Sequence, residues 1–405
     1  MKHSIMIETL LVTLVIYSIV RFGWLAVQWP GMIPNDYTMY HTTCDNWLQG
    51  QTVYRPNDPS PFKYSPTFLV TFCGTLHQVG KHAAWTHFAA LSILALAWAM
   101  RRYWLWAFGN RYPSPKIILP AIAASLVLGW HGYLEQFAYG QVDFLLFGAV
   151  VAAALCSETR RLQPIAALLL GGVLVTKPQM AIFLAYFLLT NQFKTLLLTP
   201  LFTIILLLLP ALGWGWAKHV EYFAAWKTCL HQQSAEFMTG NHNQSIAASI
   251  ARIFARRDSA IAYTQIFLAV GVAMTVATGW RIWPLGTLTT TARARLFGCV
   301  TLLYLIITPL SWRWLTFMWI PIATVVLVDA LEMNSRTKKS QLIFFGLFAL
   351  VGIFRQKIVA DAVGIREVDE LSFVGFYTLG SLFLLVAAWL GFNEKLVNRE
   401  ASLET

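Results

Sequence analysis

The sequence predicts an all-α membrane protein, because of its composition and of the apolar runs that recur along it. Of its 405 residues, 57% are hydrophobic and only 12% are charged, whereas soluble domains carry about 25% charged residues. Several runs approach the roughly 20 residues that a helix needs to cross a bilayer. Because no water satisfies backbone groups inside a bilayer, such runs must be helical.

About twelve spans are expected, with both chain ends on the cytoplasmic side. The first run, residues 7–27, is long and is not followed by a small-residue cleavage site, so we interpret it as a retained helix. Residues 67–79 carry His77 and Gln78 and favour a re-entrant or interfacial helix. The other expected spans are 83–100, 117–132, 143–156, 164–176, 179–190, 195–213, 262–280, 296–310, 314–331, 341–354 and 371–390.

The formal charge of +11 reflects membrane topology, because the basic residues are dispersed among short connections between apolar runs. Cytoplasmic loops carry such an excess of Lys and Arg, so we expect no nucleic-acid partner. This orientation places two large loops, 30–66 and 214–259, on the periplasmic or extracellular side of the inner (plasma) membrane. With no soluble segment or repeat, residues 1–405 are expected to form a single domain. The basic groups are Arg101, Arg102, Arg111 and Lys116; Arg160 and Arg161; Arg293 and Arg295; Arg336, Lys338 and Lys339.

The five cysteines form no CxxC pair and are interpreted as packing residues. A bridge between Cys44 and Cys229, both in predicted outer loops, is left open. His242 has no partner at a ligand spacing, so no metal is expected. Phosphate-binding Gly-rich loops and a Gly-x-Ser-x-Gly elbow are absent from the sequence, which argues against a cytosolic nucleotide-sugar donor and against serine hydrolase chemistry. No cofactor is expected.

Polar residues at the outer boundary of the membrane are the candidate functional residues. Polar side chains in a membrane protein carry an energetic cost, so they are informative about binding or catalysis. Asp36 follows the first helix beside aromatic residues, among them Tyr40 and Tyr64. Aromatic neighbours exclude water and raise the proton affinity of a carboxylate, as a general base for a sugar hydroxyl requires. A helix-capping or loop-stabilising Asp36 is an equally good interpretation.

Three further outer clusters contain groups suited to a phosphorylated sugar. Gln141 and Asp143 are suited to bind sugar hydroxyls, or alternatively to cap the helix after Gly140. Lys177 is suited to neutralise a lipid phosphate, or alternatively to snorkel at the boundary. In the second large loop, an amphipathic helix over 246–254 would carry Arg252 toward an anionic headgroup, while His242 and Asn243 hydrogen-bond a sugar. An ordinary polar loop before a basic interfacial helix is the alternative.

Taken in order, these motifs resemble glycosyltransferase family 87, whose members are polyprenyl-phosphate-dependent mannosyl- and arabinofuranosyltransferases of the GT-C fold. The similarity extends from the first helix to about residue 320. The motifs are Asp36-Tyr37-x-x-Tyr40, Leu48-x-Gly50-x-x-x-Tyr54, Phe62-x-Tyr64-x-Pro66, Tyr139-Gly140-Gln141-Val142-Asp143, Lys177-Pro178, Asn243-Gln244-Ser245 and Pro309-x-Ser311-Trp312.

The resemblance implies a GT-C type membrane glycosyltransferase whose partners are a polyprenyl-phosphate sugar donor, a lipid or glycan acceptor and membrane lipids. It implies inverting transfer of a hexose or pentose, with mannose favoured, and Asp36 as the base. Lys177 and Arg252 are implied near the donor phosphate, and Gln141, His242 and Asn243 near the sugars. Where the family often has histidines after Ser311-Trp312, this chain has Arg313, which would supply a phosphate contact instead.

Two other classes of function remain open from the sequence. A transporter or flippase of lipid-linked sugar would also have many spans and polar residues near the membrane midplane. Inverted repeats and charges deep within spans would favour it, and neither is evident. A scaffold without catalysis would tolerate Asp36→Asn, whereas an enzyme that uses this base would not.

Overall fold

The computed structural model describes residues 13, 17, 34–55, 58, 61–109, 113–238, 240, 242–254, 260–283, 288–332, 337–354 and 376–403. The predicted first span, 7–27, lies outside the described residues apart from Thr13 and Tyr17, and the segment 355–370 lies wholly outside them. Nearly all of the described chain is helical, and its one β-bridge joins Asn243 to Trp312.

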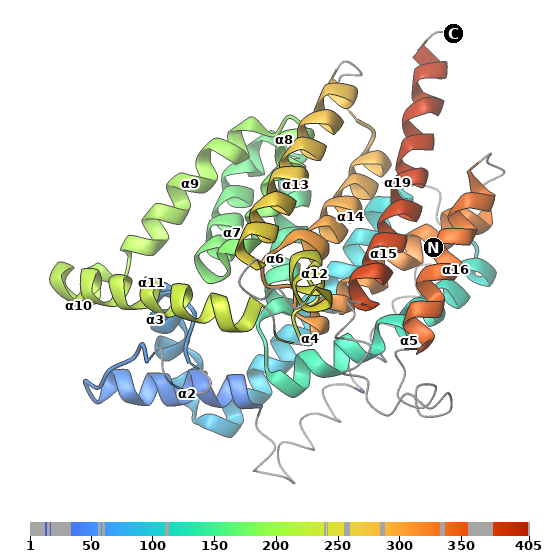
Figure 1. Ribbon diagram of the computed structural model, residues 1–405. Coiled ribbons are helices and arrows are strands. Elements are labelled where there is room, and N and C mark those ends of the chain that lie inside the picture. Colours follow the sequence, from blue (N-terminus) through green and yellow to red (C-terminus); the bar gives the residue numbers. More distant parts are fainter. Residues whose placement is uncertain are drawn as a thin grey trace.

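The described chain forms helices that follow one another with short connections (Figure 1). In order, these are α2 Asn35–Leu48, α3 Pro66–Gly74, η2 Leu76–Val79, α4 Lys81–Phe108, α5 Pro115–Tyr139, α6 Asp143–Ser157, η3 Arg160–Leu162, α7 Gln163–Thr176, η4 Pro178–Phe183, α8 Leu184–Leu189, α9 Phe193–Leu208, α10 Ala211–Trp214, α11 Trp216–Met238, α12 Ile246–Ile253, α13 Ala260–Ile282, α14 Thr290–Ile307, η7 Arg313–Met318, α15 Trp319–Glu332, α16 Lys338–Phe354 and α19 Phe376–Leu403.

The helical class is confirmed, and the apolar runs predicted as spans coincide with helices wherever the chain is described. Six of the described helices are long and apolar enough to cross a membrane: α4, α5, α9 with α10, α13, α14, and η7 with α15. Shorter apolar helices are α6, η4 with α8, and residues 377–392 of α19. The total of about twelve spans remains a prediction. Residues 67–79 form α3 and η2, which are too short to span a bilayer.

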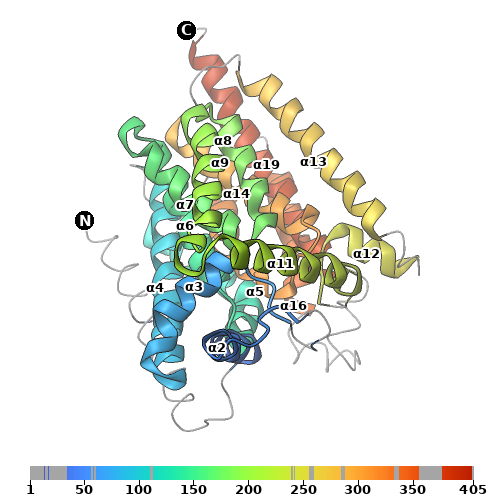
Figure 2. The same ribbon diagram turned by 90° about the vertical axis from the view of Figure 1, so that its left-hand side faces the viewer.

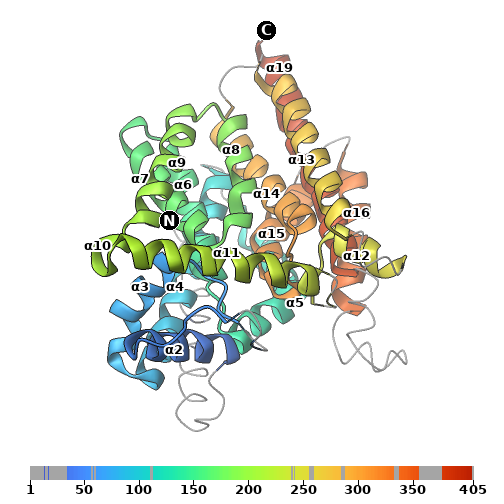
Figure 3. The same cartoon turned by 60° about the vertical axis from the view of Figure 1, so that its left-hand side comes forward.

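Both predicted outer loops contain helices. Helix α2 occupies part of the first, and α11 and α12 occupy much of the second. Figures 1 and 3 show α2 and α11 lying across one end of the bundle, at a steep angle to α9, α13 and α14. Both sequences mix charged and aromatic residues, which suits helices at a membrane surface rather than inside the bilayer.

Several basic connections gather at the other end of the bundle. The Arg293 guanidinium lies 2.6 Å from Glu158, which joins the start of α14 to the α6–α7 connection. Arg295 makes a buried pair with Asp329 near the end of α15, with N–O distances of 2.6 and 2.7 Å. Gly109, after α4, packs against Thr291. These contacts bring the start of α14, the α6–α7 connection and the ends of α4 and α15 together at one end of the bundle.

The innermost helices are α14 and α15, and α9 and α13 lie on the outside. In the apolar stretch of η7 with α15, 89% of the residues are buried, against 11% in that of α9 with α10. Glycine at position 132 allows α5 to approach the centre, because a Cβ there would overlap Thr316 Oγ1. Figure 2 shows α13 slanting along the edge of the bundle. Exposed apolar side chains on α9 and α13 therefore form surface suited to lipid.

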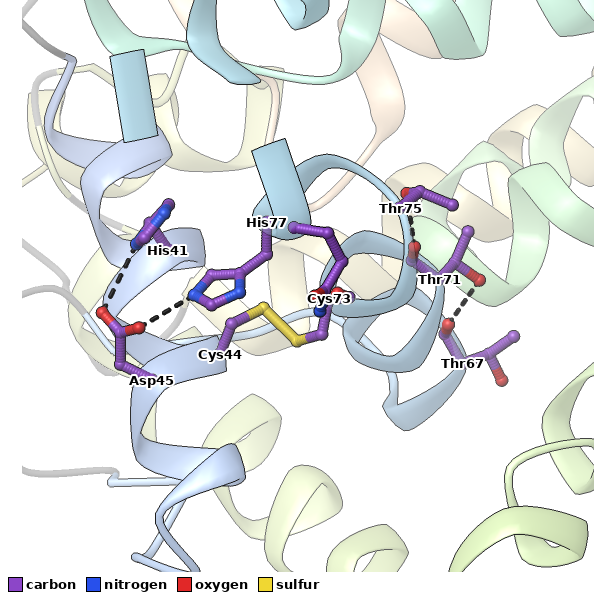
Figure 4. The surroundings of a disulfide bond; sticks show 9 residues. His41, Cys44, Asp45, Thr67, Thr71, Cys73, Thr75 and His77 are labelled. Atoms are coloured by element: carbon purple, nitrogen blue, oxygen red, sulfur yellow. Dashed lines mark hydrogen bonds and ion pairs between the residues drawn. A yellow bond between two sulfur atoms is a disulfide. The ribbon is translucent and has the colours of Figure 1, made fainter. Parts of the chain in front are cut away.

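A disulfide joins Cys44 of α2 to Cys73 of α3 (Figure 4). The Cys44–Cys229 bridge left open by the sequence is not formed, because Cys229 on α11 is buried as a free thiol. Packing of α2 against α3 brings the two bonded Cα atoms to 5.5 Å, within the usual range for a disulfide. The interpretation of Cys44 and Cys73 as packing residues was therefore wrong.

We expect loss of this disulfide to lower the thermal stability of the protein. Closing a loop of this length constrains the unfolded chain, and removing such a bond costs about 2–4 kcal/mol. The measurement compares the melting temperature of detergent-solubilised wild type with that of Cys44→Ser/Cys73→Ser, with and without reductant. Cys156→Ser, which changes a free thiol, is the control. A melting temperature of the wild type that reductant does not change would contradict the expectation.

Candidate functional site

The connection between α5 and α6 presses against the start of α2. Helix α5 ends at Gly140, whose φ of 68° and ψ of 39° are left-handed. A Cβ at Gly140 would lie 2.9 Å from both the Pro34 Cβ and the Tyr37 Cβ. Glycine is required here both for its backbone conformation and for this close approach. As a result, Gln141 reaches the first turn of α2, where Asp36 lies.

Asp36 is a partly buried carboxylate that Gln141 holds by a side-chain hydrogen bond from Nε2 to Oδ2. Burial raises the pKa of Asp36 from 3.8 to about 6, while the positive charges of Lys177 and Lys63 and the Gln141 hydrogen bond limit the rise. The N-terminus of α2 also favours the ionised form. A carboxylate poised near neutral pH in this way is suited to accept a proton.

Gln141 links Asp36 to two further groups. Its Oε1 accepts hydrogen bonds from the Tyr64 hydroxyl at 3.2 Å and from the Lys177 ammonium at 3.4 Å. With its carbonyl oxygen so engaged, the amide can only present its NH₂ group to Asp36. The orientation of the bond to the carboxylate is therefore fixed by the neighbours of Gln141.

Lys177 and Asp143 form a buried ion pair, with the Lys177 nitrogen 2.8 and 2.9 Å from the two carboxylate oxygens. Asp143 opens α6 and Lys177 closes α7, so each charge lies at the helix end that favours it. Pro178 follows Lys177, which keeps Lys177 extended and ends α7 there. Gln136 also donates to Asp143, at 3.4 Å. The ion pair explains Lys177 at this depth without snorkelling.

The segment before α3 is held so that Tyr64 faces this network. The backbone carbonyl of Tyr64 accepts a hydrogen bond from the Tyr54 hydroxyl at 3.0 Å. The backbone carbonyl of Lys63 accepts one from the Trp226 indole of α11 at 2.7 Å. The Tyr40 hydroxyl donates to that of Tyr64 at 2.8 Å. Burial raises the pKa of both phenols well above the usual value, so they remain hydroxyl donors.

A second cluster forms where the segment before α12 meets the segment before η7. Asn243 pairs with Trp312 in the β-bridge, and its side chain bonds the backbone of Pro309, Ser245 and Ser311. The His242 ring lies near Tyr139 and Trp314, with centroid distances of 6.4 and 6.3 Å. Tyr139 directly precedes Gly140, so this cluster adjoins the connection that carries Gln141.

Both arginines of the second cluster are bound to protein groups. Arg313 lies 2.7 Å from Glu135, near the end of α5. Arg252 is buried and donates to the carbonyls of Gly240 and Asn243 at 2.9 and 2.8 Å. Burial lowers the pKa of Arg252 to about 10, so it still carries its charge at neutral pH. The predicted helix over 246–254 is confirmed as α12, with Arg252 turned inward.

The predicted site residues thus fall into two groups. Tyr40, Tyr64, Gln141, Asp143 and Lys177 are joined to Asp36 in one network, and the other four meet in the second cluster. Glu135 and Gln136 belong to the same polar cluster of the sequence as Gln141 and Asp143, but they were not among the predicted site residues, and their pairing with Arg313 and Asp143 was not predicted. A sequence signal did exist, since Gln136 and Glu135 lie in the last turns of α5 and their polar side chains are costly in an apolar helix.

Sequence comparison identifies relatives of the chain and its family. One similar protein is the polyprenol-phosphate-mannose-dependent alpha-(1-2)-phosphatidylinositol mannoside mannosyltransferase of Mycolicibacterium smegmatis, 26% identical over 326 residues, which cover 75% of this chain and 73% of the relative. The protein of the same name from Mycobacterium tuberculosis is 26% identical over 333 residues, covering 77% and 74%. No solved structure matches the chain. A sequence model of glycosyltransferase family 87 matches residues 62–309, which is more than half of the chain. The protein therefore belongs to glycosyltransferase family 87 and is a glycosyltransferase.

Proposed function

We propose that the protein transfers mannose from a polyprenyl-phosphate donor to a hydroxyl of a lipid or glycan acceptor, with inversion. The observation that carries this proposal is the buried Asp36, with a pKa of about 6, in a network with a lysine and an amide. The names of the two mycobacterial relatives support mannose and its polyprenyl carrier. Asp36 precedes the segment matched by the family model, so its assignment rests on this geometry.

In the proposed reaction, Asp36 takes the proton of the acceptor hydroxyl as its oxygen bonds to the anomeric carbon. The bond from that carbon to the phosphate oxygen breaks, and polyprenyl phosphate leaves as an anion. Direct attack from the opposite face inverts the anomeric configuration. A retaining reaction would require a second carboxylate as nucleophile, but Asp143 is fully buried and paired with Lys177. The arrangement therefore supports a single displacement.

Positive charge is needed where the leaving phosphate develops its own charge. Lys177, Arg252 and Arg313 are proposed for this role. Each is now held by protein groups, and a doubly charged phosphate would compete with a carboxylate or a carbonyl for them. Lys177 is the best-supported candidate of the three, because it already donates a hydrogen bond to the Gln141 amide that holds Asp36.

The remaining predicted residues are proposed to define the sugar site. Gln141, Tyr64 and His242 supply polar groups, and His242 lies near the rings of Tyr139 and Trp314. Tyr40, Asp143 and Asn243 are fully buried, which favours indirect roles in which Tyr40 positions Tyr64, Asp143 positions Lys177, and Asn243 positions the backbone beside His242.

We further propose that the site faces the periplasmic or extracellular side of the inner membrane. Two features of the structure support this side. Basic connections gather at the end of the bundle opposite to α2, as expected of a cytoplasmic face. The Cys44–Cys73 disulfide lies on α2 and α3, and such bonds persist in oxidising compartments.

Asp36→Asn is expected to lower the rate of sugar transfer by at least about 100-fold. The variant protein should still be inserted in the membrane. The assay measures transfer of radiolabelled sugar from polyprenyl-phosphate-mannose, and separately from the arabinofuranose donor, to lipid acceptors in membranes. Asp58→Asn, at an exposed residue, is the matched control. Transfer that survives Asp36→Asn would remove Asp36 as the base, and transfer only from the arabinofuranose donor would replace the proposed sugar.

The activity should also depend on pH through Asp36. Since only the ionised carboxylate accepts a proton, kcat/KM is expected to fall about tenfold per pH unit below an apparent pKa of about 6. The contribution of Asp36 to folding stability changes with pH in the opposite direction to the activity. The folded pKa lies above the usual 3.8, so any contribution of Asp36 to stability is present below pH 4 and is lost as the pH rises through 6. Asp36→Asn should therefore melt no lower than wild type at pH 7. A flat activity profile from about pH 4.5 to 8 would contradict this role.

A double-mutant cycle can separate the contribution of Lys177 and Asp143 to stability from their contribution to activity. Removing one partner of a buried pair costs about 3–5 kcal/mol, so Lys177→Gln and Asp143→Asn should each lower the melting temperature. The double variant should lose less stability than the sum of the two single losses. It should nevertheless remain inactive if Lys177 holds the donor phosphate. Lys218→Gln breaks an exposed pair with Glu221 and should leave the melting temperature near that of the wild type, because exposed ion pairs contribute little to stability. A stable double variant with wild-type activity would exclude the phosphate role.

A further inference from the structure

A second group of chemically active side chains lies on α2 beyond Asp36. His41 Nδ1 is 3.3 Å from one oxygen of Asp45, and His77 Nε2 of η2 is 2.8 Å from the other. The two imidazole rings lie side by side, with centroids 4.2 Å apart (Figure 4). The three potential ligand atoms lie within 4.8 Å of one another. None of the three residues takes part in the Asp36 network.

The spacing of these residues is one that helices use to bind metals. His41 and Asp45 are four residues apart on α2, so their side chains project from the same face. Helix η2 brings His77 to that face from a separate part of the chain. Two imidazoles and one carboxylate are a donor set found at zinc sites that keep a fourth position open.

We propose that His41, Asp45 and His77 bind a divalent transition-metal ion of the zinc class. Ligand atoms about 2.0–2.2 Å from a tetrahedral zinc ion lie roughly 3.3 Å from one another. His41 lies 3.3 Å from one carboxylate oxygen of Asp45 and His77 lies 2.8 Å from the other. With one ligand atom from each residue, all distances are within 4.8 Å, so small side-chain movements would bring the set to this spacing. Two nitrogen donors among three ligands favour zinc and its neighbours over Mg²⁺ or Ca²⁺, which prefer oxygen ligands.

The disulfide holds the two parts of the site together before any metal binds. Cys44 directly precedes Asp45, and Cys73 lies four residues before His77. The bond therefore fixes α2 against the segment that carries the third ligand, which lowers the entropy that metal binding must overcome. Because Cys44 and Cys73 are oxidised, neither is available as a thiolate ligand.

The site is sheltered but open to solvent. The side chains of His41 and His77 are 13% and 12% exposed, and that of Asp45 is 47% exposed. An ion can thus enter past Asp45, and water can fill the fourth position. The expectation of no metal came from His242 alone, and it did not consider ligands that the α2–α3 packing assembles. A bound ion would tie α2, the helix of Asp36, to η2.

Metal binding by the purified full-length protein tests the proposal without use of the transferase activity. The protein, carrying a tag without histidines, is stripped with a chelator and titrated with Zn²⁺. Bound metal is measured by elemental analysis, and the coordination geometry by the visible spectrum of the Co²⁺ form. We expect one ion per chain, tetrahedral Co²⁺ bands, and a higher melting temperature with Zn²⁺ than with the chelator.

His77→Gln and Asp45→Asn should each weaken zinc binding by more than about tenfold and should remove the stabilisation by zinc. His87→Gln, at an exposed histidine of α4, is the control and should bind like wild type. In the presence of chelator, all variants should melt near the wild-type temperature, which shows that they fold. Absence of zinc uptake by the wild type, or uptake that His77→Gln leaves unchanged, would show a purely hydrogen-bonded triad and overturn the proposal.

Discussion

The buried ion pair between Lys177 and Asp143 is the interaction on which the candidate site depends. It joins the C-terminal end of α7 to the N-terminal end of α6, so each charge lies at the helix end that stabilises it. Through its bond to Gln141, Lys177 also helps to orient the amide that holds Asp36. A buried pair is rarely justified by stability alone. Here it supplies a fixed positive charge beside Asp36, and this charge limits the rise in the pKa of Asp36.

The rest of the site follows from close packing around that pair. Gly140 lets the α5–α6 connection touch the start of α2. The segment before α3 is held by hydrogen bonds from the side chains of Tyr54 and Trp226 to its backbone carbonyls. Burial in this packing removes water from Asp36 and so raises its pKa. Rigid positioning by elements that are far apart in sequence is what a preorganised site requires.

The helical class and the residues of the first network could be predicted from the sequence, and the reasons are physical. Apolar runs report helices directly, and a polar residue such as Asp36 or Lys177 at the edge of a run is costly enough to be informative. Pairings between distant segments were harder, since local spacing does not encode them. The Cys44–Cys73 bond, the Arg313–Glu135 pair and the arrangement of His77 with Asp45 all depend on how α2, α3 and α5 pack.

The ion pair also constrains how the chain enters the membrane. A charged residue at the centre of a lone inserting helix costs about 2.5–3.5 kcal/mol on the translocon scale. The cost is smaller at the helix ends, where Asp143 and Lys177 lie, but it still favours a paired charge. Asp143 and Lys177 lie on consecutive helices, α6 and α7, that are joined by a short connection containing Arg160 and Arg161. Inserted as a hairpin, the two helices can neutralise each other during biosynthesis, before any other part of the site exists. Substitutions that separate the pair should then impair the yield of inserted protein as well as the finished enzyme.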